Sequence, residues 1–208
     1  ALTGSRYALF CADTFAAQCG LARAPFDPLL VFHIVFGKSV PEISLNAVAN
    51  LGYAEGRFLA PVYPGDTLTA SSEVIGLKQN SNGKTGVVYV RTTGSNQAGE
   101  PVLSYVRWVM VNKRDESAPV QNAPAPELAS VVAPDALMLL PGLNLSRYDY
   151  ALAGAPHAFE DYAVGEKIDH VDSMTIEEAE HQLATRLYQN TAKVHFDALA
   201  QQGSRFWR

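Results

Sequence analysis

Cysteine is scarce in this chain: 208 residues include only two, Cys11 and Cys19. Two cysteines at this spacing fit neither a zinc site nor a disulfide framework. We therefore expect ordinary buried thiols in a reducing compartment, which predicts a cytoplasmic protein with no metal centre.

Positive charge and long apolar runs are also lacking. Lysine and arginine number 16 against 21 acidic residues, and the net charge is −5, which argues against the basic surface of a nucleic-acid-binding protein. The longest apolar run, PLLVFHIVFG at 28–37, is far shorter than the roughly 18 residues that span a bilayer. We expect neither a nucleic-acid partner nor a membrane partner.

Common catalytic signatures are missing as well. The sequence contains no serine nucleophile elbow, no phosphate-binding glycine loop and no dinucleotide fingerprint. The hydrophobic fraction of 48% and the charged fraction of 18% are nevertheless typical of a folded globular protein.

The first clear element is a helix that is apolar on every side. Asp27 can cap it, Pro28 suits its first position, and Gly37 suits the position just past its end. His33 is the one polar residue between them, and we interpret it as a core or pocket-wall residue. A helix that is apolar all round must be buried all round.

Four segments with strand composition follow this helix. They are rich in Val, Tyr, Thr and Trp, and turn signals separate them. They cover residues 51–61, 67–78, 86–94 and 101–112. Successive long strands predict a strongly curved antiparallel meander. We therefore predict an α+β fold in which a curved antiparallel sheet is wrapped around a central helix.

The pattern changes beyond the last strand. Residues 113–156 are rich in proline and lack periodicity, so we interpret them as a linker on the surface. A strand is expected within residues 158–174. A helix should follow, because Thr175 and Glu178 have the spacing of a capping box. Its apolar stripe would be formed by Ile176, Ala179, Leu183 and Leu187, and it should end at Asn190.

Polar groups crowd the stretch LYQNTAKVHFD, residues 187–197, just past that helix. His195 is the best candidate for proton transfer, because histidine titrates near neutral pH. We interpret His157 and His170 as structural or exposed, and His181 as part of a solvated helix face that binds no metal. On residue types alone, a solvated loop remains the alternative to a site.

Two motifs resemble the MaoC-type hot-dog hydratase family. The stretch RFLAPVYPGDTLTASSEV at 57–74 contains its P-V-x-x-G-D-T-L turn, and QAGEPVLSYVRWVMV at 97–111 contains its Gly-Glu-x-Val turn. Longer stretches, among them VGEKIDHVDSMTIEEAEHQLATRLYQNTAKVHFDA, are similar to the mesaconyl-CoA hydratases within that family. The resemblance covers most of residues 1–208 and implies that the helix at 28–36 is the one enclosed by the hot-dog sheet.

The resemblance also implies a double hot-dog of greater length. Residues 1–112 would be a first, degenerate hot-dog lacking its N-terminal part, and residues 113–156 the linker. Residues 157–208 would open a second, catalytic hot-dog, so we expect an internal piece of a longer chain. In the first half, Ser5 and Phe10 take the Asp and His positions of the hydratase motif, which leaves no proton-transfer group there.

The hydratase motif itself reads Gly-Asp-x-Asn-Pro-hydrophobic-His-x-Asp in this family. Without gaps, its histidine falls on His195, its last aspartate on Asp197 and its catalytic aspartate on Asn190; a gap would instead match Asn190 to the family's asparagine. The resemblance implies that His195 handles a proton of water while Asn190 orients that water. Arg186 and Lys193 are the nearest cations for a substrate carboxylate.

The activity implied by the resemblance is reversible hydration of mesaconyl-CoA to β-methylmalyl-CoA by a homo-oligomer. The acyl-CoA thioester would be the substrate, and no cofactor other than the CoA it carries is expected. Donors to the thioester oxygen would lie beyond Arg208. The alternatives are another R-specific enoyl-CoA hydratase, a hot-dog thioesterase, or a non-catalytic acyl-CoA binding module.

Overall fold

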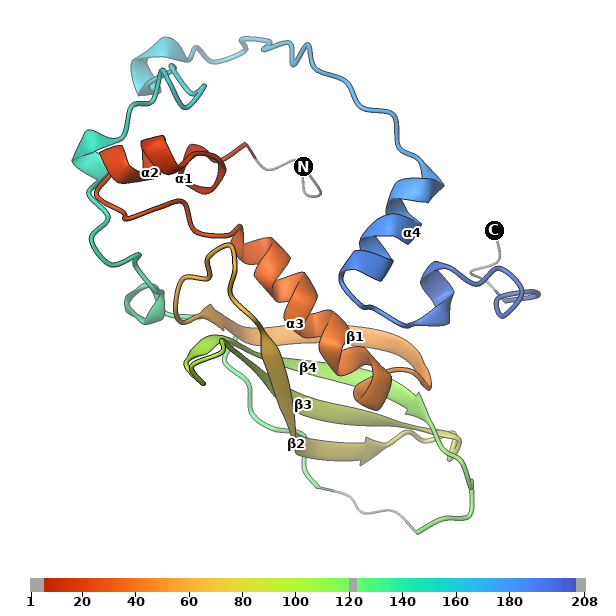
Figure 1. Cartoon of the computed structure of the whole chain (residues 1–208). Helices are drawn as coiled ribbons and strands as arrows, with labels where there is room; N and C mark the ends of the chain where they lie inside the picture. The colour runs from red at the N-terminus through yellow and green to blue at the C-terminus, as the bar shows by residue number, and fades with distance from the viewer. Residues whose placement is uncertain (1–5, 120–122, 205–208) are drawn as a thin grey trace.

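A curved sheet packed against one helix forms the body of the molecule (Figure 1). The computed structural model describes residues 6–119 and 123–204. The strands are β1 (Ala47–Phe58), β2 (Thr69–Gln79), β3 (Thr85–Ser95) and β4 (Pro101–Asn112), and helix α3 (Pro28–Ile43) lies across one face of their sheet. The predicted α+β hot-dog arrangement, a sheet curved around a central helix, is confirmed.

The strand order β1-β4-β3-β2 corrects one part of the prediction. Strands β2, β3 and β4 form the expected meander, but β1 pairs with β4. The connection at 59–68 passes the start of α3, where Phe26 N donates a 2.6 Å hydrogen bond to the Val62 carbonyl. Val62 and Leu68 are buried in the core. The connection runs from β1 at one edge of the sheet to β2 at the other edge. Burial of Val62 and Leu68 stabilises this long connection.

The main core lies between α3 and the sheet. Its buried members are Val31, Val35, Val62, Leu68, Val102, Leu103 and Tyr105. Gly94 on β3 lies under the helix, and a Cβ atom there would come within 2.5 Å of the Val35 side chain. Glycine at this position lets α3 approach the sheet closely.

Helix α3 begins as predicted but continues past Gly37. Asp27 Oδ1 accepts a 2.9 Å hydrogen bond from Leu29 N, and Pro28 occupies the first turn. The helix ends at Ile43, so the predicted end at Gly37 is wrong. The last turns are held by the fully buried Arg107 of β4, whose Nη2 atom donates to the Ser39 carbonyl and hydroxyl at 3.3 and 3.0 Å.

A second, smaller core surrounds α1 (Ala8–Cys11) and α2 (Asp13–Gln18). Leu140, Leu143 and Tyr148 from the proline-rich segment pack against it. Cys19 is buried here but Cys11 is exposed, so the expectation of two buried thiols is wrong for Cys11. Phe10, at the histidine position of the motif, lies in α1, while Ser5, at the aspartate position, falls outside the described residues.

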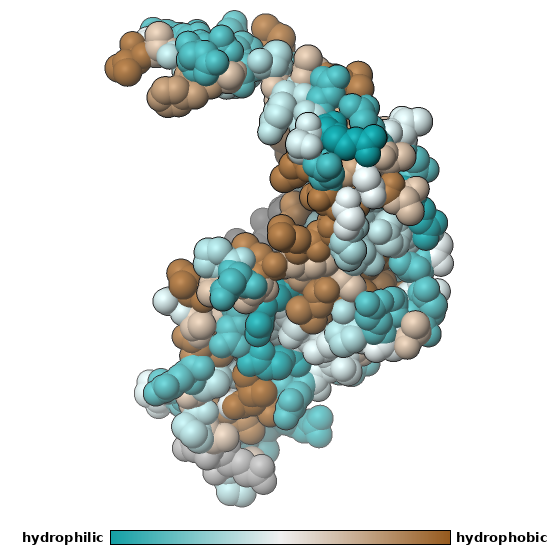
Figure 2. All heavy atoms as spheres, turned by 90° about the vertical axis from the view of Figure 1, so that its left-hand side faces the viewer, coloured by the Kyte–Doolittle hydropathy of each residue, from teal (hydrophilic) through white to brown (hydrophobic). Residues whose placement is uncertain are grey.

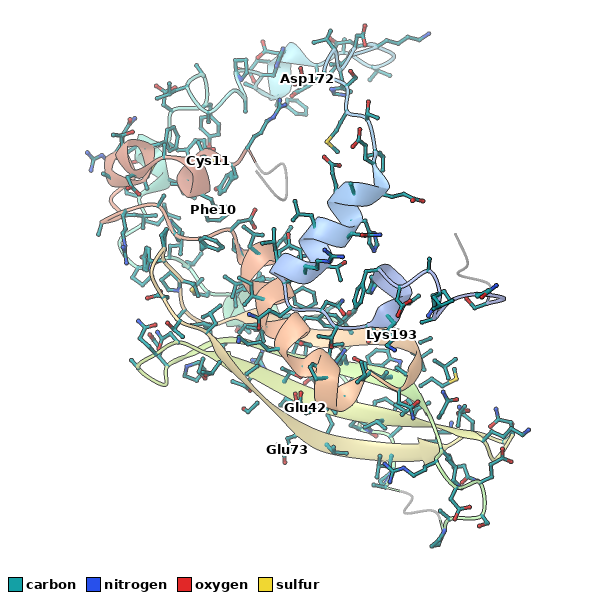
Figure 3. The ribbon with its side chains drawn as sticks, turned by 45° about the vertical axis from the view of Figure 1, so that its right-hand side comes forward. Phe10, Cys11, Glu42, Glu73, Asp172 and Lys193 are labelled. Atoms are coloured by element: carbon teal, nitrogen blue, oxygen red, sulfur yellow. The ribbon has the colours of Figure 1, made fainter. Side chains whose placement is uncertain are left out.

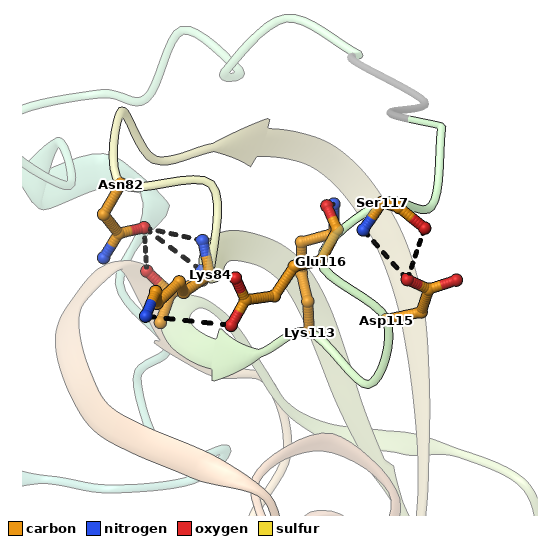
Figure 4. A network of polar contacts seen from close by, with 7 residues as sticks. Asn82, Lys84, Lys113, Asp115, Glu116 and Ser117 are labelled. Carbon is orange, nitrogen blue, oxygen red and sulfur yellow. Dashed lines mark hydrogen bonds and ion pairs between the residues drawn. The ribbon is translucent and has the colours of Figure 1, made fainter.

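The segment 113–156 runs along the surface, and its described residues form neither an α-helix nor a strand. Its 3₁₀ helices are η1 (Pro134–Ala136) and η2 (Leu145–Arg147). Near its start, Lys84 in the β2–β3 turn lies 3.9 Å from Glu116, and the Asn82 side chain accepts from Lys84 N (Figure 4). Further on, Ala123 pairs with Leu77 of β2.

The last part of the chain departs from the prediction. A 3₁₀ helix, η3 (Phe159–Asp161), is followed by extended backbone that pairs with no strand of the described residues, so the predicted strand does not form. Helix α4 (Glu178–Leu187) begins after Glu177 and has no side-chain cap, so the predicted capping box is also absent. Extended backbone without a partner strand gains no ladder hydrogen bonds.

The outline of the molecule is arched, and brown hydrophobic side chains gather where the arch bends (Figure 2). The predicted apolar stripe of α4 is one exposed set: Ile176 is 80% exposed, Leu183 55% and Leu187 52%. Among the described helices, none has both the length and the apolar character needed to span a membrane.

Candidate active site

Helix α4 ends in a Schellman motif that turns the chain into the candidate stretch. Gln189 N donates to the Arg186 carbonyl and Asn190 N to the Thr185 carbonyl, both at 3.0 Å. Gln189 itself has a φ of 58°, in the left-handed region that favours glycine. Gln189 stands where the hydratase motif has its glycine, and the backbone geometry explains why glycine suits that position.

This turn is docked on α3. A Cβ atom on Gly37 would lie 1.7 Å from the Tyr188 carbonyl oxygen. The imidazole of His33 stacks on the Tyr188 ring with centroids 4.9 Å apart and planes 14° apart. Gly37 therefore lies inside the helix and allows the two backbones to approach closely.

Partial burial shifts the pKa of both His33 and Tyr188 in this contact. Partial burial lowers the pKa of His33, with Asp27 acting in the opposite direction. Partial burial also raises the pKa of Tyr188. Both shifts favour a neutral imidazole stacked on a neutral phenol. His33 thus lies on the outer side of α3, in contact with the candidate stretch, and is not a residue of the sheet-facing core.

His195 lies at the end of the 3₁₀ helix η4 (Lys193–His195) and meets a second histidine. Its Nδ1 atom is 3.1 Å from Nε2 of His181 on α4, and the two ring centroids are 5.2 Å apart. His195 also lines a hollow of 120 Å³ together with polar side chains of α4 and the following loop. These polar side chains are Glu178, Gln182, Asp197 and Gln201.

The other predicted site residues lie around this hollow and not in its lining. Asn190 is half-buried, and its Oδ1 accepts a 3.1 Å hydrogen bond from Ala192 N. Arg186 is exposed in the last turn of α4. Lys193 is exposed at the start of η4, on the opposite side of α3 from Phe10 (Figure 3). Neither cation forms an ion pair with any of the described residues.

The contact of His181 with His195 was not predicted. From its sequence pattern, His181 was interpreted as one of several polar residues on a solvated helix face. The available signal was its spacing: Glu178, His181 and Gln182 stand at i, i+3 and i+4, so they share one face of α4. That face meets His195 only because the Schellman motif reverses the chain.

Comparison with known proteins places this fold in a family. The family described as Mesaconyl-CoA hydratase matches residues 6–130 of the 208. A mesaconyl-CoA hydratase from Cereibacter sphaeroides is 66% identical over 198 residues, covering 95% of this chain and 58% of that protein. A beta-methylmalyl-CoA dehydratase from Chloroflexus aurantiacus is 58% identical over 207 residues, covering 100% of this chain and 59% of that protein.

Solved structures agree with these relationships. A MaoC domain protein dehydratase from Chloroflexus aurantiacus superposes with a TM-score of 0.89 at 59% identity, covering 100% of this chain and 59% of that one. A Mycobacterium tuberculosis protein with a double hotdog fold superposes at 0.63 with 22% identity, over 94% of this chain and 60% of that one. The second match shows the fold alone.

The chain spans less than two thirds of the length of these relatives. The alignment with the Chloroflexus aurantiacus relative includes the motif of the β1–β2 connection. It also includes the stretch that carries His195. The family match and the two relatives confirm the resemblance: this chain belongs to the mesaconyl-CoA hydratase family.

Proposed function

We propose that this protein is a hydro-lyase that reversibly converts mesaconyl-CoA to β-methylmalyl-CoA. The observation that supports this most is the 66% identity, over 95% of the chain, to a protein named mesaconyl-CoA hydratase. Water adds across a double bond conjugated to the thioester, so one O–H bond of water breaks while a C–O and a C–H bond form. The reaction needs no redox partner, and CoA takes part only as the carrier of the acyl group.

His195 is the proton-transfer residue in this proposal. Its Nδ1 faces His181, so the other ring nitrogen, Nε2, is the atom that would accept a proton from water. The position of His195 on the wall of a polar hollow supports this role, because a water molecule needs several polar partners.

Asn190 is proposed to orient the attacking water. Its Oδ1 accepts from Ala192 N, and its Nδ2 donors are the atoms that we propose for water or substrate. An amide donor can hold water by its lone pair but cannot take its proton, which leaves proton transfer to His195.

Arg186 and Lys193 are the cations proposed for the free carboxylate of mesaconyl-CoA. Both are exposed and outside the hollow. The hollow itself contains Glu178 and Asp197, which would repel that carboxylate. The substrate would therefore place its carboxylate toward the Arg186 and Lys193 side of the loop.

A homo-oligomer is proposed as well. Strand β1 is an edge of the sheet, and its Val48, Leu51 and Tyr53 are 45%, 42% and 47% exposed. Apolar side chains along a sheet edge are a common site of association. Cys11 is exposed and forms no disulfide bond, which is compatible with the reducing cytoplasmic location that we propose.

The test is a comparison of two substrates with the protein expressed at the full length encoded by its gene. We expect hydration of mesaconyl-CoA with a higher kcat/KM than that of crotonyl-CoA, measured by loss of enoyl-thioester absorbance. Efficient turnover of crotonyl-CoA with mesaconyl-CoA untouched would show that the substrate assignment is wrong. Release of CoA thiol, detected with a thiol reagent, would indicate a thioesterase, and binding without turnover a binding module.

A further inference from the structure

His181 and His195 form a pair of imidazoles in hydrogen-bond contact, so the protonation of one ring nitrogen depends on that of the other. His181 Nε2 and His195 Nδ1 are 3.1 Å apart. A hydrogen bond between two ring nitrogens needs one proton, so one nitrogen donates and the other accepts. Each neutral imidazole carries one N–H, so the contact couples the two tautomers: His195 Nε2 lacks a proton when His195 Nδ1 is the donor to His181.

We propose that His181 is the positioning residue for His195 in the hydration reaction. The proposal rests on the proposed function, in which His195 is the base. His195 would donate its Nδ1–H to His181, which leaves the lone pair of Nε2 available to water. As the water oxygen bonds to the β-carbon and its proton moves to Nε2, the electron pair of the double bond would pass into the thioester enolate. The resulting imidazolium would keep its Nδ1–H bonded to the neutral His181. The proton would then pass from Nε2 to the α-carbon, and His195 would return to its starting form.

The backbone of His181 is held by Thr185, one turn later in α4. The Thr185 hydroxyl donates a 2.8 Å hydrogen bond to the His181 carbonyl, and Thr185 is only 7% exposed. The Thr185 carbonyl in turn accepts the Schellman hydrogen bond from Asn190 N. One buried residue therefore joins the turn that carries His181 to the loop that leads to His195, which supports a fixed relation between the two backbone segments.

Charged groups also lie near the pair. Glu178 and Asp197 line the same hollow as His195, while Lys193 opens η4 beside it. The atom within hydrogen-bond distance of His195 Nδ1, however, belongs to His181. In the ungapped hydratase motif the catalytic aspartate is replaced by Asn190, which cannot accept a proton at neutral pH. A histidine partner would supply an acceptor for the imidazolium without a carboxylate.

The experiment compares His181→Ala, His181→Gln and His195→Ala in the full-length protein, with Glu180→Ala as the matched control. Glu180 is an exposed residue of α4 outside the hollow. We expect His181→Ala to lower kcat about 10- to 100-fold with KM within about twofold, a smaller loss than the 10²–10⁴ of a proton-transfer group. The acid limb of the kcat/KM profile should move to lower pH, because the imidazolium of His195 loses its acceptor.

Rescue separates positioning from a purely structural role. His181→Gln keeps a side-chain acceptor and should recover most of kcat, with a Tm like that of the wild type. Loss of activity in His195→Ala, combined with wild-type kcat and pH profile in His181→Ala, would overturn this inference and leave the proposed function intact. Full activity of His195→Ala would instead remove His195 from the reaction and the pair with it. Equal losses of kcat in the Ala and Gln variants, with matching falls in Tm, would also overturn the inference.

Discussion

At the scale of single residues, the candidate site depends on one backbone conformation. Gln189 adopts a φ of 58°, and the Schellman motif around it reverses the chain so that His195 returns to the His181 face of α4. Side chains other than glycine pay a steric cost in this region of φ and ψ. The backbone at Gln189 is therefore locally strained, and this strained conformation is the one that reverses the chain.

Gln189→Gly should raise the free energy of unfolding by up to about 1 kcal/mol, because glycine adopts the left-handed conformation without that cost. Gln182→Gly is the matched control: it lies inside α4, where glycine should cost about 1 kcal/mol. Denaturant unfolding measures both. A loss of stability in Gln189→Gly would contradict this account of the turn.

His195→Ala should lower kcat by roughly 10²–10⁴, the usual contribution of a general acid–base group. Tm should change little, because the residue is only half-buried in a loop past a helix end. Steady-state kinetics and a thermal melt on the full-length protein measure the two effects. An unchanged kcat and KM would mean that LYQNTAKVHFD is a solvated loop.

Asn190→Asp distinguishes two roles for the amide. If the side chain only needs an oxygen to hold water, activity should stay within about tenfold. We expect a larger loss. Oδ1 already accepts from Ala192 N, and the Nδ2 donors are the atoms proposed to bind water or substrate, so removing them should reduce kcat by more than tenfold with the fold unchanged. Kinetics together with the far-ultraviolet CD spectrum decides between them.

At the scale of elements, α3 has two faces with different uses. One face packs on the sheet, and the other receives the turn after α4 at Gly37 and His33. A glycine inside a helix costs about 1 kcal/mol relative to alanine. The cost at Gly37 is explained by the backbone of Tyr188, which leaves no room for a Cβ atom.

Gly37→Ala should therefore displace the candidate loop while strengthening the helix. We expect kcat to fall by at least about tenfold, since a shift of about 1 Å in a catalytic group can cost 10²-fold, with Tm unchanged or raised. Gly56→Ala on β1 is the matched control, because a Cβ atom there meets nothing within 4 Å. Wild-type kcat in Gly37→Ala would show that the docked turn does not matter for the reaction.

The connection between β1 and β2 is joined to the β3–β4 turn through Asp66. Its carboxylate accepts from Tyr63 N at 2.8 Å and from Gln97 Nε2 at 2.9 Å. These hydrogen bonds, the Tyr63 one first, hold the pKa of Asp66 below its ordinary value of 3.8. A lowered folded-state pKa means that the stabilisation is fully present above the unfolded pKa and is lost as pH falls through the folded one.

Asp66→Asn should cost about 1 kcal/mol at neutral pH, a modest value because the carboxylate is partly exposed. The difference from the wild type should shrink below about pH 4, where the wild type loses the same stabilisation. Urea unfolding at several pH values measures it. Glu73→Gln, an exposed carboxylate on β2, should have no such effect. A difference that stays constant down to about pH 2 would contradict the assignment.

At the scale of the whole molecule, apolar surface remains uncovered over α4. Ile176, just before the helix, and Leu183 and Leu187 on it are all more than half exposed. Exposed large apolar side chains favour association. The body formed by α3 and the sheet, in contrast, has a buried core between the helix and the sheet.

The 208 residues expressed alone should therefore associate, and the variant with Ile176, Leu183 and Leu187 each replaced by Glu should associate less. Sedimentation velocity over a concentration series measures this. Val131→Glu, a charge on the proline-rich segment at a position that is 75% exposed, should leave the association unchanged. A monomeric wild-type chain at every concentration would refute the prediction.

Local patterns in the sequence determined much of the fold. The Asp27 cap, Pro28 in the first turn and the composition of the four strands were sufficient, because capping and β-propensity act over a few neighbouring residues. The turn residues between the strands likewise located the ends of β2, β3 and β4. The family could be recognised from the motifs of two turns for the same reason, since each motif serves a local backbone geometry.

Contacts between distant residues decided the rest. The pairing of β1 with β4, the continuation of α3 through Gly37 and the unpaired segment at 162–177 all depend on which segments meet in space. The meeting of His181 and His195 is of the same kind. Nothing in the stretch LYQNTAKVHFD reveals that its histidine faces another one, because the reversal of the chain at Gln189 and the docking of Tyr188 on α3 are tertiary interactions.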